Sequence, residues 1–228
     1  MRLHRFYIEE NLRVKDELTL RDGGFIHQLR DVFRLSADDR VILFDGQGID
    51  YTFDIKMLSK KEINLEKVGE EKSFIGDTKV TLLMSLIKKD NFEMVLEKGT
   101  ELGVTHFVPV ITERVQKKNI DMVRANKIIK EASEQCGRGD LPSMGEMSEL
   151  SDVLNDYKDI IAFDISGIPL QPNQLTNLPA SLLIGPEGGW SDKELEMFKE
   201  KKVKIFKLGN TTLRAETAAI VAVSKVTG

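Results

Sequence analysis

The stretch Leu182–Ser191, LLIGPEGGWS, and a second stretch, Leu208–Ala218, LGNTTLRAETA, decide the fold of this 228-residue chain. Each runs from an apolar, strand-like segment into a tight turn and then into a helix start. Proline fixes one backbone angle, whereas glycine admits positive φ and lets a ligand approach the backbone closely. Two such turns lying side by side would form a rim of backbone N–H and C=O groups beside apolar walls. The pattern therefore predicts a pocket for a small cofactor.

The residues around these turns exclude some classes of cofactor site. Ser191-Asp192-Lys193-Glu194 predicts a capping box, so the first turn leads into a helix N-terminus. No Gly-Lys-Ser/Thr follows, and the glycine spacing is not that of the dinucleotide fingerprint, which excludes both of those motifs. A tight strand-to-helix turn without a ligand is the alternative. Arg214 would place a cation beside the pocket, unless it forms a structural salt bridge with Glu216 or Glu187.

Strands and helices alternate from Val80 onward, which predicts an α/β domain with a mostly parallel sheet covered by helices. Asp90-Asn91-Phe92-Glu93 resembles a capping box and opens a helix that Gly103 ends. The expected strands cover residues 81–87, 107–111, 159–164, 181–185 and 203–208, and a long helix covers 121–137. Pro109 indicates an edge or a strand end, because proline cannot donate a ladder hydrogen bond.

Residues 1–72 are predicted to form a small, mainly β unit. Short strands at 5–8 and 63–68 flank a hairpin at 41–57 that turns at Gly46-Gln47-Gly48. A helix at 24–34 places Phe25, Leu29, Val32 and Phe33 on one side. Short strands around one small core predict a compact barrel.

Composition and charge exclude several classes of protein. With 33 Lys and Arg against 37 Asp and Glu, the net charge of −4 argues against a generally basic nucleic-acid binder. Seven of the 11 arginines nevertheless fall in the first forty residues: Arg2, Arg5, Arg13, Arg21, Arg30, Arg34 and Arg40. Guanidinium groups bind phosphate and stack on bases, which suggests RNA contact. The alternative is a solvated surface of mixed charge.

Cysteine and histidine usage indicates an intracellular protein without a metal centre. Cys136 is the single cysteine, which excludes an internal disulfide and fits a reducing compartment. His4, His27 and His106 are widely separated, so no metal site is expected. The N-terminus lacks the apolar region of a secretory signal, and the apolar runs are too short to span a bilayer. We therefore expect a cytoplasmic location without membrane insertion.

Several ordered motifs together carry a family resemblance. With the two C-terminal stretches, the chain resembles the SPOUT superfamily of methyltransferases and, more narrowly, the RsmE family of 16S ribosomal RNA (uracil-N3)-methyltransferases. The upstream motifs are HQLRDVFRL at 27–35, KGTELGV at 98–104, TER at 112–114 and EASEQCGR at 131–138. Trp190 stands where phenylalanine is usual, and Asn210-Thr211-Thr212 replaces a run that carries a second arginine near the pocket.

The resemblance implies both a fold and a cofactor. It implies a small N-terminal PUA-like β-barrel for RNA binding at 1–72, and a SPOUT-type parallel sheet with a deep trefoil knot at 73–228. It also implies S-adenosylmethionine as the cofactor and a homodimer as the working form. The residues expected to hold the cofactor are Phe163, Ile184, Gly185, Pro186, Glu187, Gly188, Gly189, Leu208, Gly209 and Leu213.

The resemblance further implies methylation of uridine N3, with Arg214 as the catalytic residue that stabilises the uracil anion. The substrate would be 16S ribosomal RNA, within the assembled small ribosomal subunit. The residues nominated to bind it are Arg5, His27, Arg30, Arg34, Arg114 and Arg138. Two alternatives remain open: a SPOUT enzyme acting on another RNA position, and a non-catalytic RNA-binding ribosome-assembly factor. A nucleotide-dependent oxidoreductase is a third, weaker alternative without its fingerprint.

Overall fold

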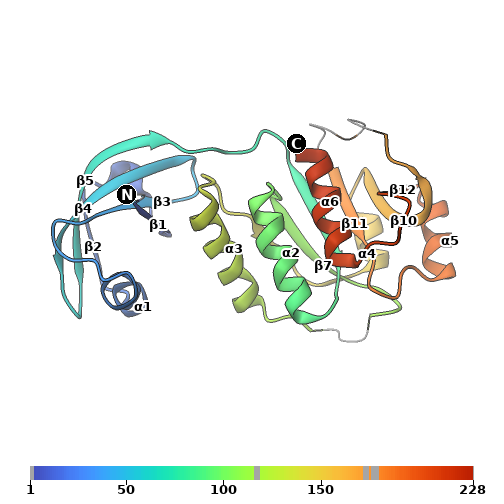
Figure 1. The fold of residues 1–228 in the computed structure, drawn as a ribbon, viewed down its shortest axis with the longest axis horizontal. Helices are drawn as coiled ribbons and strands as arrows, with labels where there is room; N and C mark the ends of the chain where they lie inside the picture. Colours follow the sequence, from blue (N-terminus) through green and yellow to red (C-terminus); the bar gives the residue numbers. More distant parts are fainter. Residues whose placement is uncertain (1–2, 116–118, 172–174, 176–179, 228) are drawn as a thin grey trace. The chain divides into compact units, whose positions relative to one another are not determined.

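The apolar strands of the chain form two separate sheets, each with its own buried core (Figure 1). The computed structural model describes residues 3–115, 119–171, 175 and 180–227. The chain divides into two units. One comprises Met1–Ile75 with Ser133–Asp140, and the other comprises Gly76–Ala132 with Leu141–Gly228. The shorter segment of the first unit is the end of a helix and the turn that follows it.

The first unit contains a five-stranded sheet in the order β1-β3-β4-β5-β2. Its strands are β1 (His4–Tyr7), β2 (Glu17–Leu20), β3 (Arg40–Phe44), β4 (Ile49–Leu58) and β5 (Ile63–Lys72). The predicted hairpin is confirmed as β3 and β4, and Gly46 and Gly48 adopt positive φ in its turn. β1 runs parallel to β3, whereas the remaining pairs are antiparallel. Sequence reasoning missed β2, which has four residues.

A helical segment packs on this sheet and changes type halfway. α1 (Gly23–His27) continues as a π-helix over Gln28–Val32, in which the Phe33 N–H donates to the Gln28 carbonyl at 3.0 Å. Leu29 is fully buried, but Val32 is 61% exposed, so the expected apolar side is wrong at that residue. A π-turn holds more residues than an α-turn. The extra residue rotates Val32 outward and brings Phe33 against the core.

Arg5 occupies the interior of the first unit. Its Nε and Nη2 donate to the two carboxylate oxygens of Asp50, at 2.8 and 2.6 Å. Nη1 donates to the Ser133 carbonyl at 3.0 Å, and Nη2 also donates to the Arg138 carbonyl at 2.8 Å. The guanidinium carbon lies 3.5 Å from the centre of the Phe44 ring. This buried side chain therefore serves the unit's own structure, which revises its nomination for RNA contact.

The second unit confirms the predicted parallel sheet. Its order is β12-β10-β11-β6-β7-β8, with β9 also paired to β7, and every recorded pair is parallel. The strands are β6 (Val80–Ser85), β7 (His106–Ile111), β8 (Ser143–Met144), β9 (Ser148–Glu149), β10 (Ile160–Pro169), β11 (Ala180–Ile184) and β12 (Lys204–Lys207). Pro109 lies between the part of β7 that pairs β8 and the part that pairs β9.

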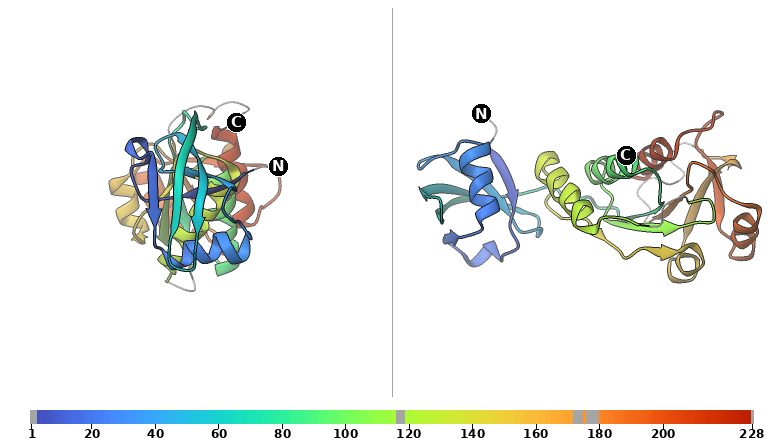
Figure 2. Two further views of the ribbon diagram at one scale, coloured as in Figure 1. Left: turned by 90° about the vertical axis from the view of Figure 1, so that its left-hand side faces the viewer. Right: turned by 90° about the horizontal axis from the view of Figure 1, so that it is seen from below.

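Helices cover both faces of this sheet (Figures 1 and 2). They are α2 (Lys89–Glu101), α3 (Met122–Cys136), α4 (Leu150–Asp156), α5 (Asp192–Glu200) and α6 (Ala215–Thr227). α2, α3 and α6 share one core, which includes Leu82 and Leu182. α4 and α5 share the core on the other face, which includes Leu83 and Leu183. The alternation of these leucines between faces is the two-residue period of a strand buried on both sides.

The two predicted capping boxes have different outcomes. At α5 the box is complete: the Ser191 side chain accepts from the Glu194 N–H, and the Glu194 side chain accepts from the Ser191 N–H. At α2 the prediction is wrong: a cap at Asp90 implies a helix that begins at Asn91, but the helix begins two residues earlier, at Lys89. Its cap, Lys88, makes no side-chain capping bond with the described residues. Glu93 instead pairs with Arg124 at 3.0 Å. In the part of the chain that the structure describes, no helix is long and apolar enough to cross a membrane.

Candidate functional site

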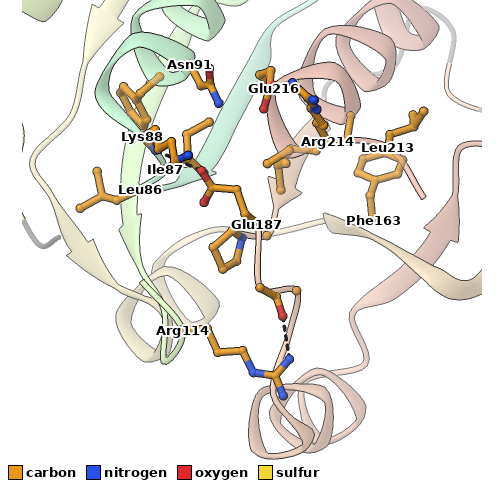
Figure 3. A pocket seen from close by; sticks show the side chains of 18 of the residues that line it. Leu86, Ile87, Lys88, Asn91, Arg114, Phe163, Glu187, Leu213, Arg214 and Glu216 are labelled. Carbon is orange, nitrogen blue, oxygen red and sulfur yellow. Dashed lines mark hydrogen bonds between the residues drawn. The ribbon is translucent and has the colours of Figure 1, made fainter. Parts of the chain in front are cut away.

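A cavity of about 1140 Å³ opens at the carboxyl ends of β6, β10, β11 and β12 (Figure 3). Open parallel sheets characteristically bind ligands at this edge, because the loops that leave neighbouring strands meet there. All ten residues predicted to hold the cofactor line the cavity: Phe163, Ile184, Gly185, Pro186, Glu187, Gly188, Gly189, Leu208, Gly209 and Leu213. The stretches Leu182–Ser191 and Leu208–Ala218 thus meet at one cavity.

The first loop, Gly185–Trp190, is held by its own turn and by the tryptophan. The Gly189 N–H donates to the Pro186 carbonyl at 2.9 Å, and Gly189 has a φ of 66°. The buried Trp190 indole N–H donates to the Phe163 carbonyl at 3.1 Å. A Cβ on Gly185 would lie only 3.0 Å from the Trp190 ring, so a side chain there would displace the indole. Phenylalanine at 190 could not make the bond to β10.

Glu187 reaches from this loop to the start of α2. Its Oε1 accepts from the backbone N–H of Lys88 at 3.2 Å (Figure 3). Lys88 is the cap residue of α2, and a carboxylate is favourable near the positive end of a helix. This contact fixes the distance between the glycine loop and the segment Leu86–Lys89, which forms the opposite wall. In this structure Glu187 therefore shapes the cavity.

The residues that follow β7 brace the same loop from outside. Arg114 Nη1 donates to the Gly188 carbonyl at 2.7 Å, and the arginine side chain remains exposed (Figure 3). The Ser191 hydroxyl donates to Glu113 at 2.6 Å, and the Glu113 N–H donates to the buried Glu194 carboxylate at 2.9 Å. The TER motif thus contacts the glycine loop and the start of α5. Arg114, nominated for RNA contact, lies on the cavity wall.

Arg214 and Glu216 stand at the start of α6 and both line the cavity (Figure 3). The Arg214 side chain is exposed, and in the described part of the chain no hydrogen bond or ion pair involves its guanidinium. The proposed salt bridge to Glu216 or Glu187 is therefore not formed, and that alternative is wrong. Glu216 is 7% exposed, and its buried Oε2 has no hydrogen-bond partner among the described residues.

A break in β10 supplies a further part of the cavity. Its pairing with β12 shifts register between Phe163 and Ile168, and the residues between them form a bulge. Asp164 Oδ1 accepts from the Ser166 N–H at 2.9 Å and from the Ser166 hydroxyl at 2.6 Å. A Cβ on Gly167 would lie 2.6 Å from the backbone of Phe206, so only glycine fits. The bulge places Asp164 and Ile165 on the cavity wall.

Sequence reasoning missed some of the lining residues. These include Leu86, Lys88, Asn91, Asp164 and Glu216. Leu86 and Lys88 could have been found, since they lie at the end of the strand predicted at 81–87 and directly after it, and so belong to the same sheet edge. The sequence indicates Glu216 only as a salt-bridge partner for Arg214, and it indicates Asn91 only as part of a capping box. Asp164 could also have been found, since it ends the strand predicted at 159–164, but the bulge that follows is not visible in the pattern of residues.

The remaining RNA-contact nominees lie in the first unit and fall into two groups. Arg138 is buried and donates to Asp140 at 2.9 and 2.7 Å, so it serves the interior as Arg5 does. His27, Arg30 and Arg34 lie on or just after the helical segment. Hydrogen bonds from Arg30, and secondarily from His27, lower the pKa of the Asp31 carboxyl to about 2. Arg34 is exposed, has a φ of 57° and ends the helix.

Comparison with known proteins identifies the families that the chain resembles. Residues 76–227 match an RNA methyltransferase domain family, and residues 26–68 match an RNA methyltransferase PUA domain. Ribosomal RNA small subunit methyltransferase E of Aquifex aeolicus is 32% identical over 97% of this chain and 98% of its own length. The protein of that name from Rickettsia conorii is 28% identical over 99% of this chain and 96% of its own length.

Two solved structures resemble the whole chain. A putative methyltransferase from Legionella pneumophila, in complex with the bound cofactor SAM, has a TM-score of 0.90 at 28% identity, covering 98% of this chain and 96% of that one. A ribosomal RNA small subunit methyltransferase E from Neisseria gonorrhoeae, bound to S-adenosyl methionine, has a TM-score of 0.89 at 28% identity with the same coverage. As its motifs predicted, the chain belongs to the RNA methyltransferase family and, within it, to the family of ribosomal RNA small subunit methyltransferase E.

Proposed function

We propose that this protein transfers a methyl group from S-adenosylmethionine to N3 of a specific uridine in 16S ribosomal RNA. The observation that carries the proposal is the meeting of the two C-terminal loops at one cavity, with Arg214 unpaired at its wall. Family membership supports the reaction class. The cofactor is supported by two structures at 28% identity that were solved with it bound.

The residues present fit the cofactor. Apolar side chains from Leu86, Phe163 and Leu213 offer walls for an adenine ring, and the backbone of Gly185–Gly189 offers polar groups beside them. The cavity of about 1140 Å³ exceeds the usual size of a small-molecule site, so it has room for a nucleobase as well as a cofactor. When bound, S-adenosylmethionine supplies a methyl group on a positively charged sulfur.

The chain's own residues contribute orientation and electrostatics. Uracil N3 carries a proton near neutral pH, and the loss of that proton leaves negative charge on the neighbouring carbonyl oxygens. The Arg214 guanidinium stabilises this charge from the start of α6. The walls of the cavity hold the nitrogen in line with the methyl group, which lowers the entropic part of the barrier.

We further propose the organisation that this function requires. Residues 1–72, completed by Ser133–Asp140, form the RNA-binding domain, with His27, Arg30 and Arg34 as its contacts. The rest of 73–228 forms the methyltransferase domain, with a trefoil knot through its C-terminal loops. The exposed Arg114 would contact RNA at the mouth of the cavity. The working form is a cytoplasmic homodimer that acts on the small ribosomal subunit. Light scattering on the purified protein tests the dimer, and a monomer would contradict it.

Two measurements test the proposed reaction. Calorimetry should detect S-adenosylmethionine binding to the purified protein, and the absence of binding would overturn the proposal. Mass spectrometry of 16S ribosomal RNA from a deletion strain should reveal one missing 3-methyluridine, restored by the wild-type gene. A different missing modification would instead indicate another RNA position. Cofactor binding without any missing modification would favour an assembly factor.

The role of Arg214 is tested in the same strain. We expect Arg214→Ala to reduce methyl transfer about 100- to 1,000-fold, because a preorganised donor to the developing anion is lost. Cofactor affinity measured by calorimetry should remain that of the wild type. Arg40→Ala is the matched control, since Arg40 is an exposed arginine on β3 that pairs with Asp54. Full restoration of the modification by Arg214→Ala would remove Arg214 from the reaction while leaving the family assignment intact.

A further inference from the structure

Glu216 presents an unusual carboxylate to the cavity. The residue is 7% exposed, its Oε2 is buried without a hydrogen-bond partner, and the described residues give it no ion pair. Burying an ionised carboxylate without donors is unfavourable. Its place in the first turn of α6 offsets part of that cost, since the N-terminal end of a helix favours negative charge. A ligand that donates a hydrogen to Glu216 would offset more.

The position of Glu216 relative to Arg214 indicates which donor fits. The two side chains leave the same helix start two residues apart, and residues at that spacing do not face each other on a helix. They line one cavity without pairing (Figure 3). Arg214 offers N–H donors and Glu216 offers an acceptor. A planar group with a carbonyl oxygen next to an N–H would complement both.

The imide edge of uracil is such a group, with N3–H flanked by two carbonyl oxygens. Cytosine carries a lone pair at N3, which a carboxylate would repel. The α-ammonium group of the cofactor is a less suitable partner, because it would bring a second positive charge beside Arg214. We propose, on the basis of the function proposed above, that Glu216 accepts the N3–H of the target uracil and removes that proton.

In the proposed step, Glu216 takes the N3 proton and the methyl group takes its place on N3. The N3–H bond breaks and its proton passes to the Glu216 carboxylate, which leaves the electron pair on N3. That pair forms the bond to the methyl carbon, the carbon–sulfur bond breaks, and its electrons neutralise the positive sulfur. Arg214 stabilises the charge on the adjacent carbonyl during the transfer. Once the methylated base has left, Glu216 returns the proton to solvent.

Glu216→Gln tests the proposal, because glutamine keeps the shape of the cavity wall but cannot take a proton. With small ribosomal subunits that lack the methyl group, we expect single-turnover transfer to fall roughly 100- to 10,000-fold. The residual rate should rise about tenfold per pH unit from about pH 6 to about pH 9, since hydroxide must then remove the proton. The wild-type rate should depend much less on pH over the same range.

Three further measurements separate this role from a structural one. Cofactor affinity of Glu216→Gln should equal that of the wild type, and its Tm should be unchanged or higher because a buried anion is removed. Glu216→Asp should keep the shallow pH profile of the wild type at a reduced rate. Glu200→Gln, the same change at an exposed residue of α5, should match the wild type throughout.

Several outcomes would overturn the proposal. A wild-type transfer rate in Glu216→Gln would remove the residue from proton transfer. Loss of cofactor binding in that variant would assign Glu216 to the cofactor's ammonium group instead. A steep pH profile in Glu216→Asp would also contradict it. Failure of the proposed function looks different, since the wild type itself would then bind no cofactor or modify no uridine.

Discussion

At the scale of single residues, Trp190 shows how one side chain can fix a binding loop. Its ring lies against Gly185 of the glycine loop, packs edge-on against Phe198 and donates a hydrogen bond to the Phe163 carbonyl of β10. Phenylalanine would preserve the packing but lose the bond. The loop is therefore coupled to the sheet through one N–H group.

We predict that Trp190→Phe lowers the free energy of unfolding by about 1 kcal/mol, the net value of a typical intramolecular hydrogen bond. For a protein of this size that corresponds to a fall in Tm of roughly 2–4 °C. Thermal denaturation followed by circular dichroism measures it. Tyr157→Phe is the control, because its hydroxyl lies 3.4 Å from His106 and far along the sequence from the loop. Equal Tm values for wild type and Trp190→Phe would contradict the prediction.

For single residues, the sequence predicted some parts of the site but not the buried polar side chains. The ten residues nominated for the cofactor could be named because the family resemblance pointed to the loops that contain them, and all ten line the cavity. The structural role of Arg5 could not be predicted, since its guanidinium donates to the carbonyl groups of Ser133 and Arg138, more than a hundred residues away in the chain. The buried state of Glu216 was also hidden, because an acidic residue in the first turn of a helix is ordinarily exposed.

At the scale of elements, the β10 bulge is the least replaceable part of the site. Gly167 lies against the backbone of β12, with 2.6 Å between its hypothetical Cβ and the Phe206 carbonyl carbon. Backbone atoms cannot move aside as a side chain can. The bulge also aims Asp164 and Ile165 at the cavity, so its geometry bears directly on the site.

We predict that Gly167→Ala destabilises the protein by about 1–3 kcal/mol, the usual cost of inserting a methyl group into a packed region. Urea denaturation measures the change. Gly69→Ala is the control, because Gly69 lies in β5 and a Cβ there would meet no atom within 4 Å. If both variants unfold at the same urea concentration, the close approach of β12 does not constrain residue 167.

The helical segment of the first unit yields a prediction about RNA. Arg34 ends the π-helical stretch with its side chain exposed, whereas Arg30 beside it is bound by Asp31. We predict that Arg34→Ala weakens binding to small ribosomal subunits and lowers the slope of log K against log salt by about 1, as expected for one lost phosphate contact. Arg21→Ala is the control, since Arg21 pairs with Glu62. An unchanged slope would exclude Arg34 from the interface.

Most elements of the fold were predictable from apolar runs or flanking turn residues. These signals identify the five longer strands of the parallel sheet and helices α2, α3, α5 and α6, and length alone did not decide, because β1 and β12 have four residues each and were predicted. The strands β2, β8 and β9 and the helix α4 were missed, and β8 and β9 have only two residues each. The π-helix could not be predicted, because residue types do not distinguish it from an α-helix. For that reason Val32 was expected on the buried side of the helix, whereas it is exposed.

At the scale of the whole molecule, the two units have separate hydrophobic cores, and the first unit also contains a buried ion pair. Arg5 and Asp50 lie 2.6 Å apart with both side chains nearly inaccessible to water. Breaking a buried pair leaves one charge uncompensated, which costs far more than losing an exposed pair. The ion pair between Arg40 and Asp54 in the same sheet provides the comparison. Its Nε–Oδ1 distance is 2.7 Å, and the Arg40 side chain is largely exposed.

We predict that Arg5→Met destabilises the protein by about 3–5 kcal/mol, because Asp50 and two carbonyl groups lose their donors. Arg40→Met should change stability by about 1 kcal/mol or less. Replacing Asp50 with leucine in the Arg5→Met background should recover part of the loss, since no charge is then left buried. Urea denaturation of the three variants measures these changes in the free energy of unfolding. A loss for Arg5→Met as small as that for Arg40→Met would contradict the role of the pair.

The inclusion of Ser133–Asp140 in the first unit has an evolutionary consequence. A gene fusion that transplanted only residues up to Ile75 onto another enzyme would carry Arg5 without the carbonyl groups of Ser133 and Arg138. Recombination at a single breakpoint would thus yield a domain with unmet hydrogen bonds at its centre. The N-terminal domain is therefore expected to be inherited together with its catalytic neighbour, as one heritable block.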